Sequence, residues 1–425
     1  MNTPLERSLR LLKTGTAFVN NAVQRRVNKQ RYLQLDKTPH EIIFRDGLMT
    51  VKHYKPLSED MVRIDGSTLK VRQRRFTVPL VLVPPLGVFA WIFDLMADRS
   101  MAKYFLAHGF DVYLIDWGVP RQDDQDISLE HYVIDWFPKA MRAIREHSGS
   151  QEQSLLGYCM GGLLALLYLA SSRDSKVVNL VTVASPVDMH KMGFVGGFYR
   201  VVSKPAWVFR KLTGVQIDRM QRQLFHVPGK RLSFMFKMTN PVGTVSSYFE
   251  LVRNMADDEY VSRYMTMNEW FTNMPDYPGA TVQQLIRKMG LYNRLARGRI
   301  RLGRCEADFR DISSALLAFA GNNDKIVPVA SAEAILEVVG STDKEFHVVP
   351  GGHAGVFTGG KAAHTTWAIS KDWLSQRSGI IAAAGAPDAA VPATAVVVTA
   401  ARSAADDIAA AEGVAAGAPA GNAGA

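Results

Sequence analysis

The sequence predicts an α/β protein whose sheet is mostly parallel, with helices crossing between its strands. Short, almost uninterrupted apolar runs alternate with longer segments of helical periodicity, which is typical of parallel strands buried on both faces. A glycine-rich turn at 157–162 joins one such run to a helical segment. With 425 residues, 47% of them hydrophobic, the chain is long enough for one large core and an insertion.

The predicted elements follow one another along the chain. A basic amphipathic helix is expected from Leu5 to about Val27, because apolar side chains recur there at helical spacing among basic ones. Apolar or alternating runs predict the strands, and longer periodic runs predict the helices. The strands are expected at 42–44, 49–54, 78–83, 110–116, 155–156, 178–184, 315–320 and 345–349, and further helices at 100–108, 129–147 and 163–170.

Composition divides the chain into regions. After the strand at 178–184 the pattern changes to Met-, Phe- and Trp-rich helical stretches, which predict a helical cap inserted into the core. From Gly379 onward Ala, Gly, Pro and Val dominate, which predicts a disordered tail. The predicted regions are an N-terminal helical segment at 1–37, a core at 38–185 and 299–378, a cap at 186–298 and a tail at 379–425.

The net charge of +10 is unevenly distributed. The tail from Gly379 onward sums to −3, which leaves +13 on residues 1–378. A basic body suits an anionic partner such as coenzyme A, although a basic surface also serves solubility alone. The sequence has no zinc-finger spacing, helix-turn-helix or RNA-binding aromatic signature, so we expect no nucleic-acid partner.

The sequence has two cysteines, Cys159 and Cys305. This number excludes a disulfide scaffold and a cysteine-rich zinc site, and we expect no metal and no tightly bound cofactor. Free thiols suit a reducing cytoplasm, where we expect the protein to reside. The scattered charges of Met1 to Val19 do not fit a signal peptide, and no apolar run approaches the ~18 residues needed to span a bilayer.

A nucleophile elbow with cysteine at its apex is predicted at Gly157-Tyr158-Cys159-Met160-Gly161-Gly162. In this strand-turn-helix motif the nucleophile sits in a strained turn, and a Cβ at the flanking glycines would collide with the neighbouring strand or helix. The first helical amides favour a thiolate at Cys159, and the amide of Met160 is placed to hold an oxyanion. The second oxyanion amide is expected in the loop 86–88, at Val88. A structural cysteine in a glycine-rich turn is the alternative interpretation.

An acid and a base follow the elbow in the order that this motif requires. Asp324 lies just after the strand at 315–320, and His353 just after the strand at 345–349. If these strands are neighbours, His353 would take the proton of Cys159, and Asp324 would orient the imidazole and stabilise its charged form. A turn-capping aspartate and an ordinary loop histidine are the alternatives. The three residues together predict an α/β-hydrolase fold with a Cys-His-Asp triad.

Several stretches together also match a known family. They are Gly109 to Gly118, the elbow, Ala184 to Asp188, Asn268 to Trp270, Asp308 to Ile312 and Pro350 to Val356. From about Thr38 to Trp373 the chain resembles the catalytic subunits of poly(3-hydroxyalkanoate) synthases, most closely the short class III type. It departs from them at Val88, where many members have asparagine, and in the long Ala-rich tail.

The resemblance implies a cysteine acyltransferase that loads 3-hydroxyacyl groups from coenzyme A thioesters and joins them into polyester, with release of coenzyme A. It implies that Cys159 is acylated, that His353 is the base for the thiol or for the incoming hydroxyl, and that Asp324 is the partner of the histidine. It also implies association with polyhydroxyalkanoate granules, a homodimer and an activating second subunit.

Two other classes of function stay open. A thioesterase or polyester depolymerase would use the same triad and hydrolyse the acyl-enzyme when water reaches it, so it would release free hydroxy acid. A non-catalytic protein of the granule surface would act without Cys159. Its biological effect would therefore survive the substitution Cys159→Ala.

Overall fold

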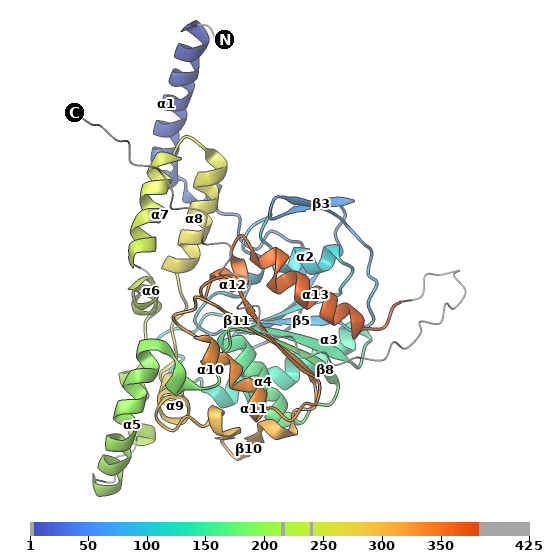
Figure 1. Cartoon of the computed structure of the whole chain (residues 1–425), viewed down its shortest axis with the longest axis vertical. Coiled ribbons are helices and arrows are strands. Elements are labelled where there is room, and N and C mark those ends of the chain that lie inside the picture. The colour runs from blue at the N-terminus through green and yellow to red at the C-terminus, as the bar shows by residue number, and fades with distance from the viewer. Residues whose placement is uncertain (1–3, 214–216, 239–240, 382–425) are drawn as a thin grey trace, which may run out of the picture. The chain divides into compact units, whose positions relative to one another are not determined.

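The computed structural model describes residues 4–213, 217–238 and 241–381. Its eight-stranded sheet has the order β1-β2-β6-β5-β7-β8-β11-β12 (Figure 1). The six strands from β6 to β12 pair in parallel, whereas β1 and β2 are antiparallel. The predicted α/β class with a mostly parallel sheet is confirmed. The strands are β1 (His40–Asp46), β2 (Met49–Tyr54), β5 (Leu80–Val83), β6 (Val112–Asp116), β7 (Gln153–Tyr158), β8 (Val177–Val183), β11 (Ala315–Gly321) and β12 (Lys344–Val349).

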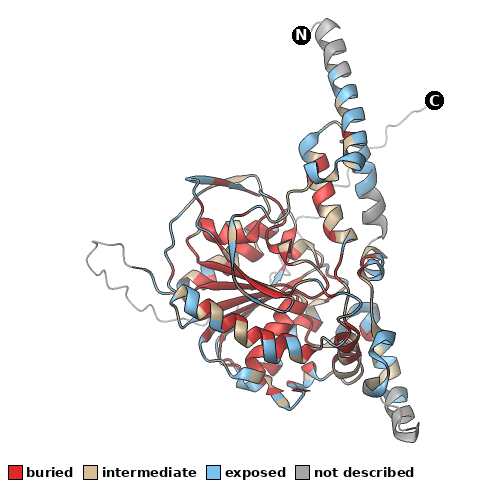
Figure 2. Cartoon of the chain, turned by 180° about the vertical axis from the view of Figure 1, so that it is seen from behind, coloured by how far each residue is buried: buried red, intermediate tan, exposed pale blue. Residues whose placement is uncertain are grey.

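Helices cover both faces of this sheet. Along β5, Val81 and Val83 belong to one buried cluster while Leu80 and Leu82 belong to another, because successive side chains of a strand point to opposite faces. The six inner strands are buried along most of their length, as Figure 2 shows in red, whereas the edge strands β1 and β12 are mostly intermediate or exposed. The first face packs against α3 (Phe137–Ser148), α4 (Met160–Ser172) and α11 (Ile335–Val338), and the second against α2 (Met101–Ala107), α12 (Gly355–Thr358) and α13 (Thr366–Gln376).

Two short hairpins were not predicted from the sequence. One joins β3 (Met61–Ile64) to β4 (Ser67–Lys70), and the other joins β9 (Arg299–Leu302) to β10 (Cys305–Asp308). Each strand has only four residues and carries charged side chains, so its apolar alternation is too short to stand out from a loop.

The chain between β8 and β9 holds the segment predicted to be a cap, and we keep that name for it. Its described residues make five α-helices, followed by a π-helix at Leu285–Leu291. Two strand-like hydrogen bonds join Val227 to Tyr277 within it. The cap helices are α5 (Gly193–Thr213), α6 (Gly229–Met238), α7 (Pro241–Arg253), α8 (Asp258–Thr272) and α9 (Gly279–Gln284), and the core adds α10 (Val329–Glu333).

The predicted N-terminal helix is present as α1 (Pro4–Val27), and its carboxyl end contacts the cap. The side-chain amide of Asn21 donates to the carbonyl of Met255 at 3.0 Å, and the Tyr32 hydroxyl donates to Asn21 at 3.0 Å. Tyr32 also packs into a small apolar cluster with Leu251 and Val261. In the part of the chain that the structure describes, every helix is too short or too polar to cross a membrane. The predicted tail lies outside the described residues from 382 onward.

Candidate active site

Cys159 forms the sharp turn between β7 and α4. Its φ of 51° and ψ of −118° place a non-glycine residue in a strained region, as a nucleophile elbow requires. Its amide donates to the carbonyl of Val183 at 2.8 Å. A Cβ on Gly157 would lie 2.4 Å from the Cα of Gly162, and one on Gly161 would lie 2.0 Å from the carbonyl oxygen of Val83. The backbone can therefore turn this tightly only with glycine at these positions.

The structure brings Asp324 and His353 together. They follow the adjacent parallel strands β11 and β12, and Oδ2 of Asp324 lies 2.7 Å from Nδ1 of His353. Both side chains are buried, with 0% of Asp324 and 7% of His353 exposed. The other carboxylate oxygen, Oδ1, accepts hydrogen bonds from the amides of Ile326 and Val327, each at 2.8 Å. Asp324 therefore caps its own turn and holds the histidine at the same time.

Asn322 links the loop that follows β11 to the loop that follows β12. Its side-chain oxygen accepts from the amide of Gly351 at 3.0 Å, and its own amide donates to the carbonyl of Val349 at 3.0 Å. The amide of Asn323 adds a third bond, to the carbonyl of Gly351 at 3.1 Å. These contacts continue the pairing of β11 and β12 beyond the strand ends, which sets the position of Asp324 relative to His353.

The charge state of His353 is governed by its two partners. Burial lowers the pKa of the imidazole, but the negative charge of Cys159, the hydrogen bonds with Asp324 and the Cys159 sulfur, and the charge of Asp324 outweigh it. The pKa of His353 is raised from 6.5 to about 10. The charged form of the His353 imidazole is thus favoured at neutral pH. His353 thus pairs directly with Asp324, and Cys159 lies near enough to raise the pKa of the same imidazole.

Tyr277 of the cap lies beside the same thiol and was missed by sequence reasoning. Burial, followed by the charge of Cys159, raises the pKa of the Tyr277 hydroxyl. A Cβ on Gly87 would lie 2.9 Å from Cε2 and 3.0 Å from the hydroxyl oxygen of Tyr277. The run Asp276-Tyr277-Pro278-Gly279 signals a turn. Nothing in that signal says that the turn reaches the elbow.

The two predicted oxyanion amides lie near the elbow. Met160 is the first residue of α4, where the amides have no partner within the helix. Val88 lies in the loop after β5 and packs against the same buried cluster as Cys159. The start of that loop approaches the elbow closely, because a Cβ on Gly161 would lie 2.8 Å from the carbonyl carbon of Pro84. The oxyanion role of both amides stays a prediction.

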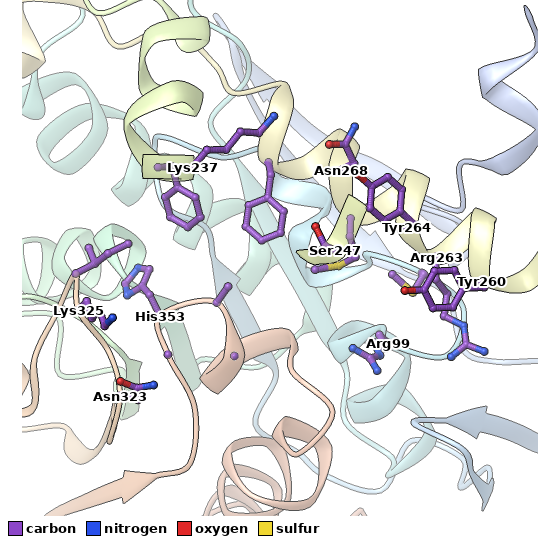
Figure 3. Close-up of a pocket in the computed structure, with 18 residues that line it drawn as sticks. Arg99, Lys237, Ser247, Tyr260, Arg263, Tyr264, Asn268, Asn323, Lys325 and His353 are labelled. Atoms are coloured by element: carbon purple, nitrogen blue, oxygen red, sulfur yellow. The ribbon is translucent and has the colours of Figure 1, made fainter. Parts of the chain in front are cut away.

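A cavity of about 770 Å³ lies next to His353. Its walls come from core loops around Asn323 and His353 and from cap helices α6 to α8 (Figure 3). Of the eighteen described residues that line it, none is acidic, and Cys159 is not among them. Its lining includes four cationic side chains, Arg99, Lys237, Arg263 and Lys325, and four aromatic ones, Phe236, Tyr260, Tyr264 and Phe271.

Comparison with models of protein families identifies the fold family of this chain. Residues 87–360 match the family model of the alpha/beta hydrolase fold, which is more than half of the chain. This match agrees with the elbow between β7 and α4 and with the mostly parallel sheet. The chain is an enzyme of the α/β-hydrolase superfamily, and the predicted fold is confirmed.

Comparison with individual proteins identifies the enzyme family within this superfamily. The poly(3-hydroxyalkanoate) polymerase subunit PhaC of Allochromatium vinosum is 34% identical over 302 residues, which is 71% of this chain and 81% of the relative. The subunit PhaC of Thiocystis violacea is 32% identical over 302 residues, with the same coverage of 71% and 81%. That of Synechocystis sp. is 26% identical over 347 residues, which is 81% of this chain and 86% of the relative. The chain belongs to the poly(3-hydroxyalkanoate) polymerase family, which confirms the predicted resemblance.

Proposed function

We propose that this chain polymerises 3-hydroxyacyl groups from coenzyme A thioesters and that Cys159 carries the acyl group. The observation that supports this most directly is the position of His353, which lies 2.7 Å from Asp324 and close enough to Cys159 for that residue to raise the pKa of the imidazole. A cysteine at the apex of an elbow with such a partner is an activated nucleophile. Membership of the polymerase family selects acyl transfer to a hydroxyl over hydrolysis.

In the loading step the Cys159 sulfur attacks the thioester carbonyl. His353 takes the proton of the thiol, because its raised pKa favours the charged imidazole. The tetrahedral intermediate collapses, the bond to the coenzyme A sulfur breaks, and the leaving thiolate takes the proton from His353. The amides of Met160 and Val88 would stabilise the negative oxygen of this intermediate. Because one thioester replaces another, loading is nearly balanced in free energy.

In the elongation step the hydroxyl of an incoming 3-hydroxyacyl-coenzyme A attacks the acyl group on Cys159. His353 accepts the hydroxyl proton, an ester bond forms, and the bond to the Cys159 sulfur breaks. The thiolate of Cys159 is restored beside a protonated His353. The chain, now one unit longer and joined to coenzyme A, is reloaded onto Cys159 with release of free coenzyme A. Each cycle thus releases one coenzyme A for each ester formed.

Polymer growth requires that a hydroxyl reaches the acyl-enzyme before water does. The cap places the partly buried Tyr277 against Gly87, where the charge of Cys159 raises the pKa of its hydroxyl. A site from which water is excluded protects a reactive thioester and strengthens the electrostatic contacts inside it. We therefore assign the cap a role in selecting the alcohol over water as the acceptor.

The cavity beside His353 suits the coenzyme A part of the substrate. Its wall holds four cations and no carboxylate among its described residues. Arg99 and Arg263 have acidic neighbours, at 3.8 Å from Asp65 and 2.6 Å from Glu259. Lys237 donates to the Thr272 hydroxyl at 2.8 Å. Cationic groups at a cavity wall attract phosphates, and the aromatic rings offer stacking surfaces for a base.

The cap and α1 expose many large apolar side chains. Clustered exposed apolar residues mark interaction surfaces in soluble proteins. We propose that they serve a second copy of this chain, an activating subunit or the surface of a polyester granule in the cytoplasm. They are Phe18, Val19, Val23 and Val27 of α1, Val195, Phe198 and Val201 of α5, Phe234, Met235 and Met238 of α6, and Tyr248, Phe249 and Val252 of α7.

The test is turnover of 3-hydroxybutyryl-coenzyme A by the purified full chain. Thiol release is followed over time, and the product is identified by chain length. Cys159→Ala should abolish polymer and thiol release, whereas Cys305→Ala should retain both. Cys305 is a matched control because it is a second half-buried cysteine, whose sulfur lies 3.5 Å from the carbonyl of Ser171.

Each product identifies one function. Long polyester that disappears with Cys159→Ala supports the proposal. Free hydroxybutyrate in place of polymer would identify a thioesterase or depolymerase. If neither forms with the wild-type chain, a single-turnover experiment measures the mass of the protein, and an adduct absent from Cys159→Ala identifies the acyl-enzyme. The absence of that adduct as well would overturn the assignment of Cys159.

A further inference from the structure

Three potential metal ligands meet at the antiparallel end of the sheet. Glu41 of β1 and His53 of β2 are a cross-strand pair, and His147 approaches them from the last turn of α3. Oε1 of Glu41 lies 3.4 Å from Nδ1 of His53 and 3.8 Å from Nε2 of His147. One ligand atom from each residue lies within 4.8 Å of the other two. Tetrahedral ligands at about 2.0–2.1 Å from a metal are about 3.4 Å apart, so the three atoms are close to the required spacing.

One hydrogen-bond network engages the histidine nitrogens that do not face Glu41, which are Nε2 of His53 and Nδ1 of His147. Nε2 of His53 lies 2.8 Å from Oδ1 of Asp111, and the Tyr113 hydroxyl donates to Oδ2 of the same carboxylate at 3.3 Å. Nδ1 of His147 lies 2.9 Å from the Tyr113 oxygen. Because the single hydroxyl proton of Tyr113 goes to Asp111, its oxygen accepts the Nδ1 proton of His147. Arg74 also pairs with that carboxylate, at 3.2 Å from Oδ2 of Asp111.

This network leaves the nitrogens that face Glu41 with unshared lone pairs. When each neutral imidazole places its one proton on the nitrogen that does not face Glu41, Nδ1 of His53 and Nε2 of His147 are acceptors. Both then face the Glu41 carboxylate, which is also an acceptor. Three acceptors that converge without a donor repel one another, so a cation at the centre would stabilise this pair of tautomers. A histidine whose second nitrogen is held by a carboxylate is the usual arrangement around a protein-bound zinc.

We propose that Glu41, His53 and His147 bind a divalent transition metal, and that the metal is zinc. Two imidazoles and one carboxylate are a ligand set typical of Zn²⁺, with water as the fourth ligand. Glu41 and His147 are partly exposed, at 48% and 34%, so water has access to the fourth position. His53 is only 13% exposed and anchors the site to the sheet.

The site is structural, because it lies at the opposite end of the sheet from the triad. Asp111 directly precedes β6, whereas Cys159 directly follows β7, and both strands run parallel to β5. The metal would join the edge strand β1, which pairs only with β2 in the described sheet, to helix α3. A bond of this kind stabilises the folded chain by mass action with the metal.

A proton on His53 is the competing explanation. Burial lowers the pKa of His53, but hydrogen bonds and charges of Asp111 and Glu41 raise it overall, so the ring could bridge two carboxylates as an imidazolium. That arrangement gives no role to the Nε2 atom of His147. His147 is therefore the residue that distinguishes a metal site from an ion pair.

The test uses the untagged full chain after removal of metals with a chelator. Titration with ZnCl₂ by calorimetry should give one bound equivalent, and titration with CoCl₂ should give the visible absorption of a low-symmetry N/O site. His147→Ala and Glu41→Gln should each weaken binding at least about tenfold, and Asp111→Asn should weaken it about 10- to 100-fold. His347→Ala is the matched control, because His347 pairs with Glu345 at 3.5 Å at another place in the sheet.

A thermal shift keeps the proposal falsifiable if a variant is less stable. Added Zn²⁺ should raise the melting temperature of the wild type, of Cys159→Ala and of His347→Ala, but not that of His147→Ala. Without metal, His147→Ala should melt close to the metal-free wild type. Failure of the wild type to bind Zn²⁺, or equal binding by His147→Ala and Glu41→Gln, would overturn the proposal.

Discussion

Oδ2 of Asp324 lies 2.7 Å from Nδ1 of His353, between two neighbouring strand ends that are themselves hydrogen-bonded through Asn322. The second oxygen of Asp324 accepts two backbone amides, so the carboxylate cannot rotate away from the imidazole. The orientation of His353 therefore depends on this contact, and its charge depends in part on it, after the charge of Cys159.

Asp324→Asn should lower the rate of coenzyme A release by at least about 100-fold, because the amide nitrogen cannot accept the Nδ1 proton of His353. The fold should persist, since the remaining side-chain oxygen can still accept from the amides of Ile326 and Val327. Initial rates with 3-hydroxybutyryl-coenzyme A measure the effect. Asp343→Asn is the control, because Asp343 pairs with Arg377 at 3.0 Å. A rate within a few fold of the wild type would show that His353 works without Asp324.

The raised pKa of His353 predicts an unusual pH dependence for the reactivity of Cys159. Because the pKa of His353 is raised to about 10, its charged form persists as the pH rises through neutrality and is lost only towards that value. The alkylation rate of Cys159 by iodoacetamide should therefore vary little across neutral pH. In Asp324→Asn two causes of the raised pKa are removed, so the charged imidazole should be lost at lower pH. A wild-type rate that rises about tenfold per pH unit, as for an ordinary thiol, would contradict this.

The parts of the site that could be predicted from sequence are those with local signatures. The glycines around Cys159 reflect a turn that admits no Cβ, and Asp324 and His353 directly follow apolar strands. Their meeting then follows from parallel pairing of β11 and β12, because the carboxyl ends of parallel strands lie on one edge of the sheet. Order along the chain and strand position were enough to propose these three residues.

The parts that could not be predicted depend on contacts between distant segments. Tyr277 reaches Gly87 only because the cap folds back onto the core, and the turn around Tyr277 carries no chemical motif. Glu41, His53 and His147 lie on two strands and a helix with no metal-binding spacing. The expectation that no metal is bound rested on cysteine number, which says nothing about imidazole and carboxylate ligands.

Tyr277→Ala should increase the access of solvent and reagents to Cys159. The ring of Tyr277 fills the space in front of Gly87, so its removal opens a path to the thiol. We expect alkylation of Cys159 to accelerate several fold and a larger share of product to appear as free hydroxy acid. Tyr248→Ala is the control, because Tyr248 is 49% exposed on α7. Unchanged alkylation and an unchanged ratio of polymer to hydroxy acid would show that Tyr277 does not cover the thiol.

Lys237→Ala and Lys325→Ala should raise the KM for 3-hydroxybutyryl-coenzyme A more than they lower kcat. Both cations line the cavity beside His353 and would contact phosphates rather than the reacting carbonyl. A charge-assisted contact to phosphate predicts a rise of about tenfold for each variant. Lys70→Ala, an exposed lysine on β4, should leave KM unchanged. If both cavity variants keep the wild-type KM, coenzyme A binds elsewhere.

Glu130 joins the cap to the core, and its substitution should cost stability in a pH-dependent way. Its carboxylate accepts from Gln284 at 2.5 Å, from Lys288 at 3.2 Å and from the amide of Gly303 at 2.9 Å. Burial raises the pKa of Glu130, but the hydrogen bond from Gln284 and the charge of Lys288 outweigh it and lower the pKa from 4.5 to about 2.

A carboxylate with a lowered pKa contributes stability that is fully present above its ordinary pKa and is lost as the pH falls towards the lowered value. Since the side chain is 25% exposed, we expect Glu130→Gln to lower the free energy of unfolding by ~1–2 kcal/mol at neutral pH. The difference from the wild type should shrink in acid. Urea unfolding of both proteins at neutral and acidic pH measures it, with the exposed Glu152→Gln as control. A difference that stays constant with pH would show that the geometry of Glu130 matters and its charge does not.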